Sequence, residues 1–583
     1  MIKNQLLNFL LISGICLYYP LHAQTMVSPA AKISTSLAPQ LLTDEHFQFI
    51  VVMDQQADVS AVKDIHGKEA KAKFIYEKLS SFAGSSQNEL RKQLDLNQVD
   101  YHSYWIVNAI LVKGDAELAL KLATRTDVQK ILANSSMSAG KPVAANANDT
   151  RDVIIPWGID SIHAPAVWAL GYKGEGAVVG GEDTGYDWEH PAIKNQYRGW
   201  NGTSVDHNYN WHDAIHAVNV NNYGSNPCGI DLSAPCDDYG HGTHTMGTMV
   251  GEDGDLKIGV APKAKWIGER NMERGWGNLS GYLESFEWFV APTDLANENP
   301  DPTKAPHVIN NSWYCSVEEG CDPTNFSLME DVVNNVKASG IVVVASAGND
   351  GPYCNTIMFP PAVFESSFTI GAVDFLFNAA PFSSRGNTQV NNIFLTKPNV
   401  AAPGVDVLSC IPGNQYAFFS GTSMAGPHVA GTVALMISAN PALAGEVDEI
   451  ENILQETAQP ATTFDGCGSD QSTSIPNNTF GFGIIDALAA VEKSLLATTA
   501  FSFEEHSNIS VMQQTTNDIL IRLTGLPSGG IFKLYTLWGE KSADRLIPDG
   551  TTIIHLSGLQ DGIYAYSVSA GKEVVSGKIL KHE

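Results

Sequence analysis

Short apolar runs that alternate with helical patterns are the feature that most limits how this chain can fold. The runs are bounded by turn-forming residues and span 176–181, 265–270, 308–312, 341–345 and 368–373. An amphipathic helical pattern at 325–339 separates two of them. Strands that are buried on both faces and joined by helices form a parallel sheet with helices on either side. We therefore predict an α/β fold built on a doubly wound parallel sheet.

Polar residues with chemical potential stand next to these predicted elements. Asp183 and Asn349 directly follow predicted strands, and reactive groups in parallel sheets gather at the carboxyl ends of strands. Ser423 stands among small residues, just before the apolar run 429–437 that predicts a helix. A helix N-terminus offers free N–H groups and a positive dipole end. A serine placed there can attack a carbonyl carbon while its own N–H stabilises the oxyanion.

Three segments, taken together, resemble the motifs of the subtilisin-like serine peptidases, the subtilases. Gly-Gly-Glu-Asp-Thr-Gly at 180–185 resembles the aspartate motif, Gly-His-Gly-Thr-His at 240–244 the histidine motif, and Gly-Thr-Ser-Met-Ala at 421–425 the serine motif. Ala-Gly-Asn at 347–349 stands between the last two, as in that family. The order Asp, His, Ser differs from the orders of chymotrypsin and the α/β-hydrolases. The resemblance covers about residues 150–495 and implies hydrolysis of peptide bonds.

The resemblance also implies a role for each site residue. Ser423 would be the nucleophile, His241 its general base, and Asp183 the group that orients the imidazole. Asn349 would donate its side-chain N–H to the oxyanion, beside the backbone N–H of Ser423. In this family the other histidines of these motifs, His244 and His428, are structural.

The walls of the main substrate side-chain pocket follow from the same resemblance. They would consist of Ser312, Trp313 and Tyr314 on one side and Ser346, Ala347 and Gly348 on the other. A rough alignment places Met358 at the pocket floor. Tyr314 and Met358 stand where the family often has glycine, so we expect a narrowed pocket and a preference for small or medium side chains.

Other functional classes fit the sequence less well. An aspartic peptidase needs a second Asp-Thr-Gly or Asp-Ser-Gly, which the chain lacks. Ala425 stands where Gly-x-Ser-x-Gly esterases need glycine. His-x-x-His at 241–244 has no internal glutamate, which disfavours a zinc peptidase. A catalytically idle subtilase-fold surface adhesin stays open as the alternative, although all four expected site residues are present.

The chemistry requires no cofactor, and calcium is the only metal that the resemblance suggests. Many relatives bind calcium through an aspartate that follows a His-Pro pair, but here Ala192 follows His190-Pro191. The loop that supplies further ligands is replaced by Glu-Asp-Gly-Asp at 252–255. Carboxylates suit a hard cation, so calcium binding stays open although the familiar site is not matched.

The flanking regions suggest a secreted precursor. Residues 1–23 read as a signal peptide, with Lys3 before an apolar run that is too short to span a membrane. Residues 24–150 alternate strand and helix patterns (strands at 47–53 and 104–112, helices within 70–94 and 116–124) and resemble a propeptide with the inhibitor domain of subtilases. Its linker at 136–152 is rich in small residues, where the family's maturation cut falls. An unrelated N-terminal module stays open as the alternative.

The peptidase domain would span 151–496, and the remaining residues 497–583 have a different sequence pattern. Short alternating strands and turn signals there predict a small β-sandwich. Its segments 534–539 and 559–564 and its lysine-flanked end resemble type IX secretion sorting domains. A substrate- or matrix-binding β-module is the alternative interpretation.

Charge and cysteine content are consistent with export from a bacterial cell. The net charge of −28 disfavours nucleic acid and anionic membranes as partners. The expected partners are protein or peptide substrates, the chain's own prodomain and the secretion machinery. Seven cysteines follow the signal peptide, and the plausible pairs are 228 with 236, 315 with 321 and 354 with 467. Cys410 lies in an apolar run (405–411) and is expected to be a buried free thiol, while a zinc site is disfavoured because no Cys-x-x-Cys occurs.

Overall fold

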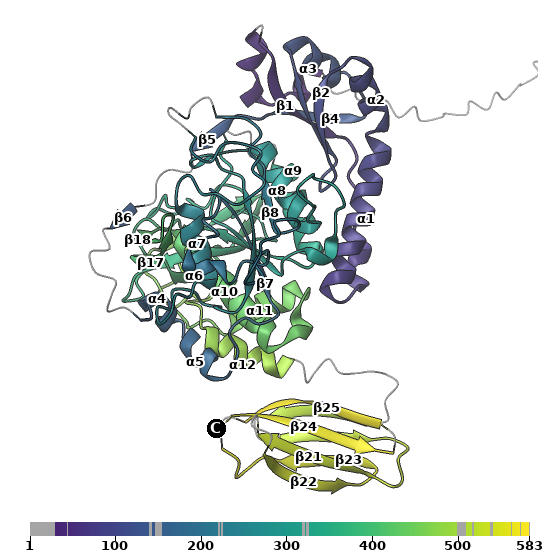
Figure 1. The fold of residues 1–583 in the computed structure, drawn as a ribbon, viewed down its shortest axis with the longest axis vertical. Helices are drawn as coiled ribbons and strands as arrows, with labels where there is room; N and C mark the ends of the chain where they lie inside the picture. The colour runs from purple at the N-terminus through teal and green to yellow at the C-terminus, as the bar shows by residue number, and fades with distance from the viewer. Residues whose placement is uncertain are drawn as a thin grey trace, which may run out of the picture.

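The computed structural model describes most of the chain between residues 29 and 581 (Figure 1). The described residues are 29–43, 45–138, 143–145, 154–219, 222, 226–317, 321, 326–497, 509–515, 518–536, 540–560, 562–571 and 573–581. The predicted signal peptide and most of the predicted linker lie outside the described residues.

A seven-stranded parallel sheet forms the centre of the molecule and confirms the predicted fold class. Its strand order is β16-β13-β12-β11-β7-β9-β8. The strands are β7 (Val178–Asp183), β8 (Trp211–Asp213), β9 (Lys265–Arg270), β11 (Val308–Asn311), β12 (Val342–Ser346), β13 (Phe368–Val373) and β16 (Val400–Pro403). The order reverses direction around β7, β11 and β9, as it does in doubly wound sheets. The carboxyl ends of these central strands carry the predicted site.

Successive side chains of the strands enter two different cores, because neighbouring residues of a strand point to opposite faces. Val308 packs with helices α7 (His241–Val250) and α10 (Thr422–Ala439), whereas Ile309 packs with α8 (Leu279–Val290) and α9 (Phe326–Ala338). The remaining helices of this domain are α4 (Trp157–Ser161), α5 (Ala164–Ala169), α6 (Pro191–Lys194), α11 (Val447–Glu456) and α12 (Ala487–Ala497). Burial on both faces explains the continuous apolar runs seen in the sequence.

The N-terminal unit is a small α+β domain that packs against α8 and α9 (Figure 1). Its antiparallel sheet has the order β2-β3-β1-β4, from β1 (Phe47–Met53), β2 (Asp100–Tyr104), β3 (Ala109–Gly114) and β4 (Val128–Ala133). Helices α1 (Lys68–Ser86), α2 (Asn88–Leu96) and α3 (Ala116–Ala123) cover it. The prediction of one strand over 104–112 was wrong, because Tyr104 pairs with Ala109 across a turn.

Short antiparallel strands form three small sheets beside the central parallel sheet. β17 (Val407–Ile411) pairs with β18 (Gln415–Ser420), and β18 leads directly into α10. β5 (Ser136–Ser138) pairs with β10 (Trp276–Asn278), and β6 (Val143–Ala145) pairs with β18. The chain that follows the N-terminal unit therefore adds one strand beside β10 and another beside β18. A further hairpin consists of β14 (Thr388–Val390) and β15 (Ile393–Leu395).

The C-terminal region folds as two antiparallel sheets around a core of its own, as predicted. One sheet has the order β19-β20-β23, and the other β22-β21-β24-β25. The strands are β19 (Ile509–Thr515), β20 (Asp518–Leu523), β21 (Gly530–Thr536), β22 (Lys541–Ile547), β23 (Gly550–His555), β24 (Gly562–Ala570) and β25 (Glu573–Lys581).

The cysteine predictions are confirmed. Disulfides join Cys228 to Cys236, Cys315 to Cys321 and Cys354 to Cys467. Cys410 is a buried free thiol. Among the residues that the structure describes, no helix is both long and apolar enough to span a bilayer.

Candidate active site

Ser423 is the second residue of α10 and stands at the helix N-terminus. Gly421 precedes the helix. The N–H of Thr422 donates to Asn349 and that of Met424 to the carbonyl of Gly421, so the N–H of Ser423 is the one of the first three that is left to a ligand. The helix dipole favours negative charge at this point. The Ser423 hydroxyl donates to the carbonyl of Ser312 at 3.4 Å, and the Ser312 hydroxyl donates to the carbonyl of Ser423 at 3.0 Å. The nucleophile's turn is thus fixed to the end of β11.

His241 and Asp183 form a buried hydrogen-bonded pair. Nδ1 of His241 lies 2.7 Å from Oδ1 and 2.9 Å from Oδ2 of Asp183, and both side chains are buried. Burial alone would lower the pKa of His241, but the charge of Asp183 and its hydrogen bond outweigh burial. The pKa of His241 consequently lies above its usual value, with a further contribution from the charge of Asp237. This arrangement fixes Nδ1 as the protonated nitrogen of the neutral imidazole, so Nε2 is the nitrogen that can accept a proton.

Asp237 organises the start of the histidine helix, and the sequence analysis missed it. Its Oδ1 accepts from the N–H groups of Tyr239 and Gly240, and its Oδ2 from the N–H of Thr243. Thr184, the neighbour of Asp183, donates its hydroxyl to the same carboxyl at 2.9 Å. Asp237 therefore ties the aspartate turn to α7. An acidic residue four positions before a helical histidine was the available signal, because aspartate commonly satisfies N–H groups near a helix start.

Asn349 is held with its amide N–H groups free to face a substrate oxygen. The N–H of Thr422 donates to Asn349 Oδ1 at 2.9 Å, and the Thr422 hydroxyl donates to the same oxygen at 3.0 Å. A backbone N–H can only donate, so the amide oxygen must point toward Thr422. The amide nitrogen is then the atom of this side chain that is left to donate to another group.

Strands β11 and β12 bring the predicted pocket residues to the same edge as Ser423. Ser346 donates to the carbonyl of Thr422 at 3.0 Å, and the N–H of Gly348 donates to the Thr422 hydroxyl at 3.2 Å. Ala347 is buried beside them. The two predicted walls, 312–314 and 346–348, thus leave neighbouring strands directly beside the nucleophile.

One detail of the predicted pocket differs in the structure. The side chain of Trp313 is buried in the core, stacked 3.9 Å from Tyr282 between ring centroids, so only its backbone can face a substrate. Met358 is 46% exposed, and its place at the pocket floor stays a prediction. Its neighbour Phe359 stacks on Tyr314, with ring centroids 5.3 Å apart.

His244 and His428 are buried and neutral. Burial lowers the pKa of His244 to about 3 and that of His428 to about 4. Nε2 of His244 bonds to the carbonyls of Val407 and Ala417, and Nδ1 of His428 bonds to the carbonyl of Met424. These contacts hold α7 against β17 and β18 and stabilise the first turns of α10, which is a packing role.

The acidic loop at 252–255 is already neutralised by cations of the chain itself. Lys257 pairs with Glu252 and donates to the carbonyl of Gly254, and Lys263 lies 2.6 Å from the other Glu252 oxygen. Asp253 accepts from the hydroxyl of Tyr416 at 2.7 Å. Both lysines pair with the Glu252 carboxylate, so a calcium ion would have to compete with them for this ligand, and calcium binding by the loop stays a prediction.

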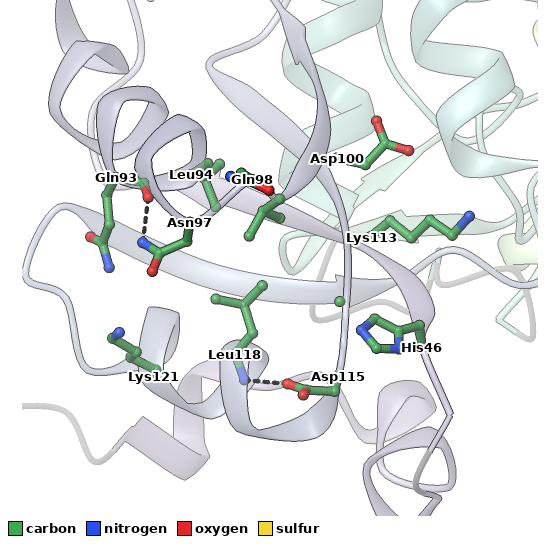
Figure 2. A pocket seen from close by; sticks show the side chains of 12 residues that line it. His46, Gln93, Leu94, Asn97, Gln98, Asp100, Lys113, Asp115, Leu118 and Lys121 are labelled. Carbon is green, nitrogen blue, oxygen red and sulfur yellow. Dashed lines mark hydrogen bonds between the residues drawn. The ribbon is translucent and has the colours of Figure 1, made fainter.

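A separate cavity of about 450 Å³ lies within the N-terminal unit (Figure 2). Its lining includes Gln93, Asn97, Lys113 and Lys121, and Asn97 donates to the carbonyl of Gln93. It contains none of the predicted site residues, so it belongs to the N-terminal unit and not to the cleft beside Ser423.

The Subtilase family profile matches residues 174–483 of this chain. This chain belongs to the subtilase family. It is 36% identical over 501 residues to bacillopeptidase F of Bacillus subtilis, a match that covers 80% of this chain and 33% of that protein. The chain therefore spans only about a third of that relative's length.

Two shorter relatives are matched over most of their lengths. Alkaline elastase YaB of a Bacillus species is 29% identical over 434 residues, which cover 73% of this chain and 92% of that enzyme. Subtilisin DY of Bacillus licheniformis is 34% identical over 308 residues, which cover 52% of this chain and 91% of that protein.

Proposed function

We propose that this chain is a secreted serine endopeptidase that hydrolyses peptide bonds of proteins. The observation that carries the proposal is the buried Asp183–His241 pair at the end of β7, together with the α10 N-terminus that bears Ser423 and is bonded to the end of the neighbouring strand β11. In the reaction, Nε2 of His241 would take the proton of the Ser423 hydroxyl as the oxygen attacks the carbonyl carbon. The Ser423 hydroxyl first has to turn away from the Ser312 carbonyl. Asn349 and the Ser423 N–H would stabilise the oxyanion, and His241 would return the proton to the leaving amine.

A fluorophosphonate tests this proposal, because it labels only an activated serine. We expect one adduct on the processed wild-type protein and none on Ser423→Ala. Ser438→Ala, in the last turn of the same helix, is the matched control and should label normally. Absence of an adduct on folded, processed wild-type protein would contradict the proposal and would favour the adhesin. Labelling also separates the proposal from an aspartic peptidase, which ignores serine-directed reagents.

We further propose that the N-terminal unit is an inhibitory prodomain that the enzyme removes itself. Three contacts of described residues support this. β5 pairs with β10, β6 pairs with β18 just before Ser423, and the N–H groups of Trp105 and Ile106 both donate to Glu287 of α8. The chain is thus paired with the peptidase domain before residue 139 and after residue 142, and we expect the maturation cut between Ser138 and Val143.

N-terminal sequencing of the mature protein tests the processing proposal. Wild type should begin with a residue between 139 and 143, while Ser423→Ala should keep the N-terminal unit attached. A Ser423→Ala protein that is cut at the same bond when produced alone would show that another enzyme performs the cleavage. No cofactor is required for this chemistry.

The C-terminal sandwich is proposed to be a sorting domain for bacterial export. Its separate core and its simple antiparallel sheets support a unit that is independent of the peptidase chemistry. Removal of residues 509–583 should abolish secretion in a host with a type IX system, while fluorophosphonate labelling of the intracellular protein persists. Normal secretion with lost binding to surface material would instead favour the matrix-binding alternative.

A further inference from the structure

An aromatic pair stands beside the proposed nucleophile and is not needed for the triad chemistry. The rings of Tyr314 and Phe359 are 5.3 Å apart between centroids and inclined by only 19°. Tyr314 lies two residues after Ser312, whose carbonyl and hydroxyl both contact Ser423. The pair therefore lies within a few residues of the point where a substrate carbonyl would be attacked.

The position of the pair follows from the sheet. β11 and β12 are adjacent and parallel, with Asn311 opposite Ala345. Beyond these ends the chain leaves the sheet as the two segments 312–314 and 346–348. Both segments are bonded to the turn that carries Ser423, through the hydroxyls of Ser312 and Ser346. A substrate side chain next to the attacked carbonyl would therefore lie close to these segments, and Tyr314 belongs to one of them.

Phe359 comes from a third segment, which is fastened to the first wall. The N–H of Cys315 donates to the carbonyl of Pro360 at 2.8 Å, so the residues after Tyr314 and Phe359 are joined directly. Disulfides Cys315–Cys321 and Cys354–Cys467 lie on the same two segments. The two backbones that carry the rings are thus joined by a hydrogen bond, and each segment is further restrained by its own disulfide.

We propose that Tyr314 and Phe359 determine specificity by filling the primary side-chain pocket, so that the enzyme accepts Gly, Ala or Ser before the scissile bond. Aromatic and long side chains are excluded because two rings already occupy the space. The proposal rests on the peptidase function proposed above. The sequence of the chain's own linker is consistent with it, since Ser138 is followed by Ala139 and Gly140.

Paired substrates test the proposal on the mature enzyme. Two peptide p-nitroanilides, identical except for Ala or Phe at the last residue, are compared by kcat/KM, with active enzyme counted by fluorophosphonate titration. Wild type should prefer Ala by about 100-fold or more, since a closed pocket rejects far more than one methylene group. The double variant Tyr314→Ala, Phe359→Ala should raise kcat/KM for Phe about 100-fold while that for Ala changes less than about threefold.

Two controls keep the result interpretable. Tyr314→Phe retains the ring and should retain the wild-type preference. Phe394→Ala removes an exposed aromatic side chain of the β14–β15 hairpin and should change neither rate. Where the double variant fails to fold, Phe359→Leu and the wild-type ratio still decide, because the wild-type preference alone is a direct consequence of the filled pocket.

A labelled wild-type enzyme that cleaves the Phe substrate as well as the Ala substrate overturns the pocket proposal and leaves the peptidase proposal intact. It would mean that the rings form a platform for aromatic side chains. A wild type that does not label overturns the peptidase proposal instead. The pocket proposal is then tested by calorimetry, which measures the affinity of the two peptides, as free acids, for Ser423→Ala protein. This protein is brought to its mature form by an added protease that cuts the linker. Tenfold tighter binding of the Ala peptide supports the filled pocket, and equal binding overturns it.

Discussion

Glu287 is the residue whose substitution should most clearly weaken the hold of the N-terminal unit on the enzyme. Its Oε2 accepts the N–H groups of Trp105 and Ile106 at 2.6 and 3.0 Å. Glu287→Ala leaves both donors without an acceptor in the complex, although each can bind water once the unit dissociates. A buried N–H without a partner costs about 1–3 kcal/mol, so the two together should cost about 2–6 kcal/mol. Compared with Glu287→Gln, which keeps an oxygen acceptor, inhibition of Glu287→Ala by the unit should be weaker by about 30-fold or more.

The charge of Glu287 should oppose binding, in contrast to its acceptor oxygen. Burial raises the pKa of Glu287 to about 8 in the complex, against the N–H bonds that would lower it. In the free enzyme the carboxyl faces water with a pKa of about 4.3, so binding takes up a proton between these two values. Affinity should therefore fall as the pH rises, by up to about tenfold per unit, and level off above pH 8. Glu287→Gln keeps an oxygen acceptor without this cost and should bind at least as tightly as wild type at pH 7.

The assay is inhibition of mature enzyme by the separately produced unit, residues 29–138, whose folding is checked by circular dichroism. The inhibition constant is measured at several pH values for wild type, Glu287→Ala and Glu287→Gln. A Glu287→Ala enzyme that is inhibited within threefold of both wild type and Glu287→Gln would refute the role of the two N–H bonds. A Glu287→Gln enzyme as weakly inhibited as Glu287→Ala would show that the negative charge, and not the acceptor, holds the unit.

Three further predictions follow from the site. Because the pKa of His241 is raised and its neutral form is the base, kcat/KM should rise with pH through a midpoint above 6.5. Asp183→Asn should move this midpoint to lower pH and lower kcat/KM. A wild-type midpoint below 6.5 would contradict the proposed effect of the Asp183 charge on His241. Asn349→Ala should lower kcat about 10²–10³-fold with little change in KM, a magnitude established for subtilisin, which is a relative of this chain. A decrease in kcat of less than about fivefold in folded enzyme would exclude Asn349 from the oxyanion hole. Removal of calcium by EGTA should not change the contribution of the 252–257 loop to stability. The Tm difference between wild type and Lys257→Met should therefore be the same with and without calcium. A Tm difference that depends on calcium would show that the loop binds the ion.

The sequence was sufficient for features that depend on local patterns. Continuous apolar runs predicted the parallel strands because burial on both faces leaves no polar alternation to read. Small-residue motifs around Asp183, His241 and Ser423 identified segments that the sheet does bring to one edge. Two disulfides bridge fewer than ten residues, so their pairing followed from proximity along the chain. The interruption between Tyr104 and Ala109 was missed because a buried turn is as apolar as the strands that it joins.

Only the tertiary structure decided which side chains face the cleft and which charges are compensated. Trp313 and Tyr314 are neighbours in sequence, yet one ring enters the core and the other stacks on Phe359, because the loop at 357–360 approaches from more than forty residues away. Asp237 had a local signal, but its bond to Thr184 and the pairing of Lys257 with Glu252 were not predictable, since the role of a carboxylate or an ammonium depends on the groups placed around it. A sequence therefore determines residue types and their local pattern, whereas side-chain direction and electrostatics depend on contacts between distant segments, which exist only once the chain has folded.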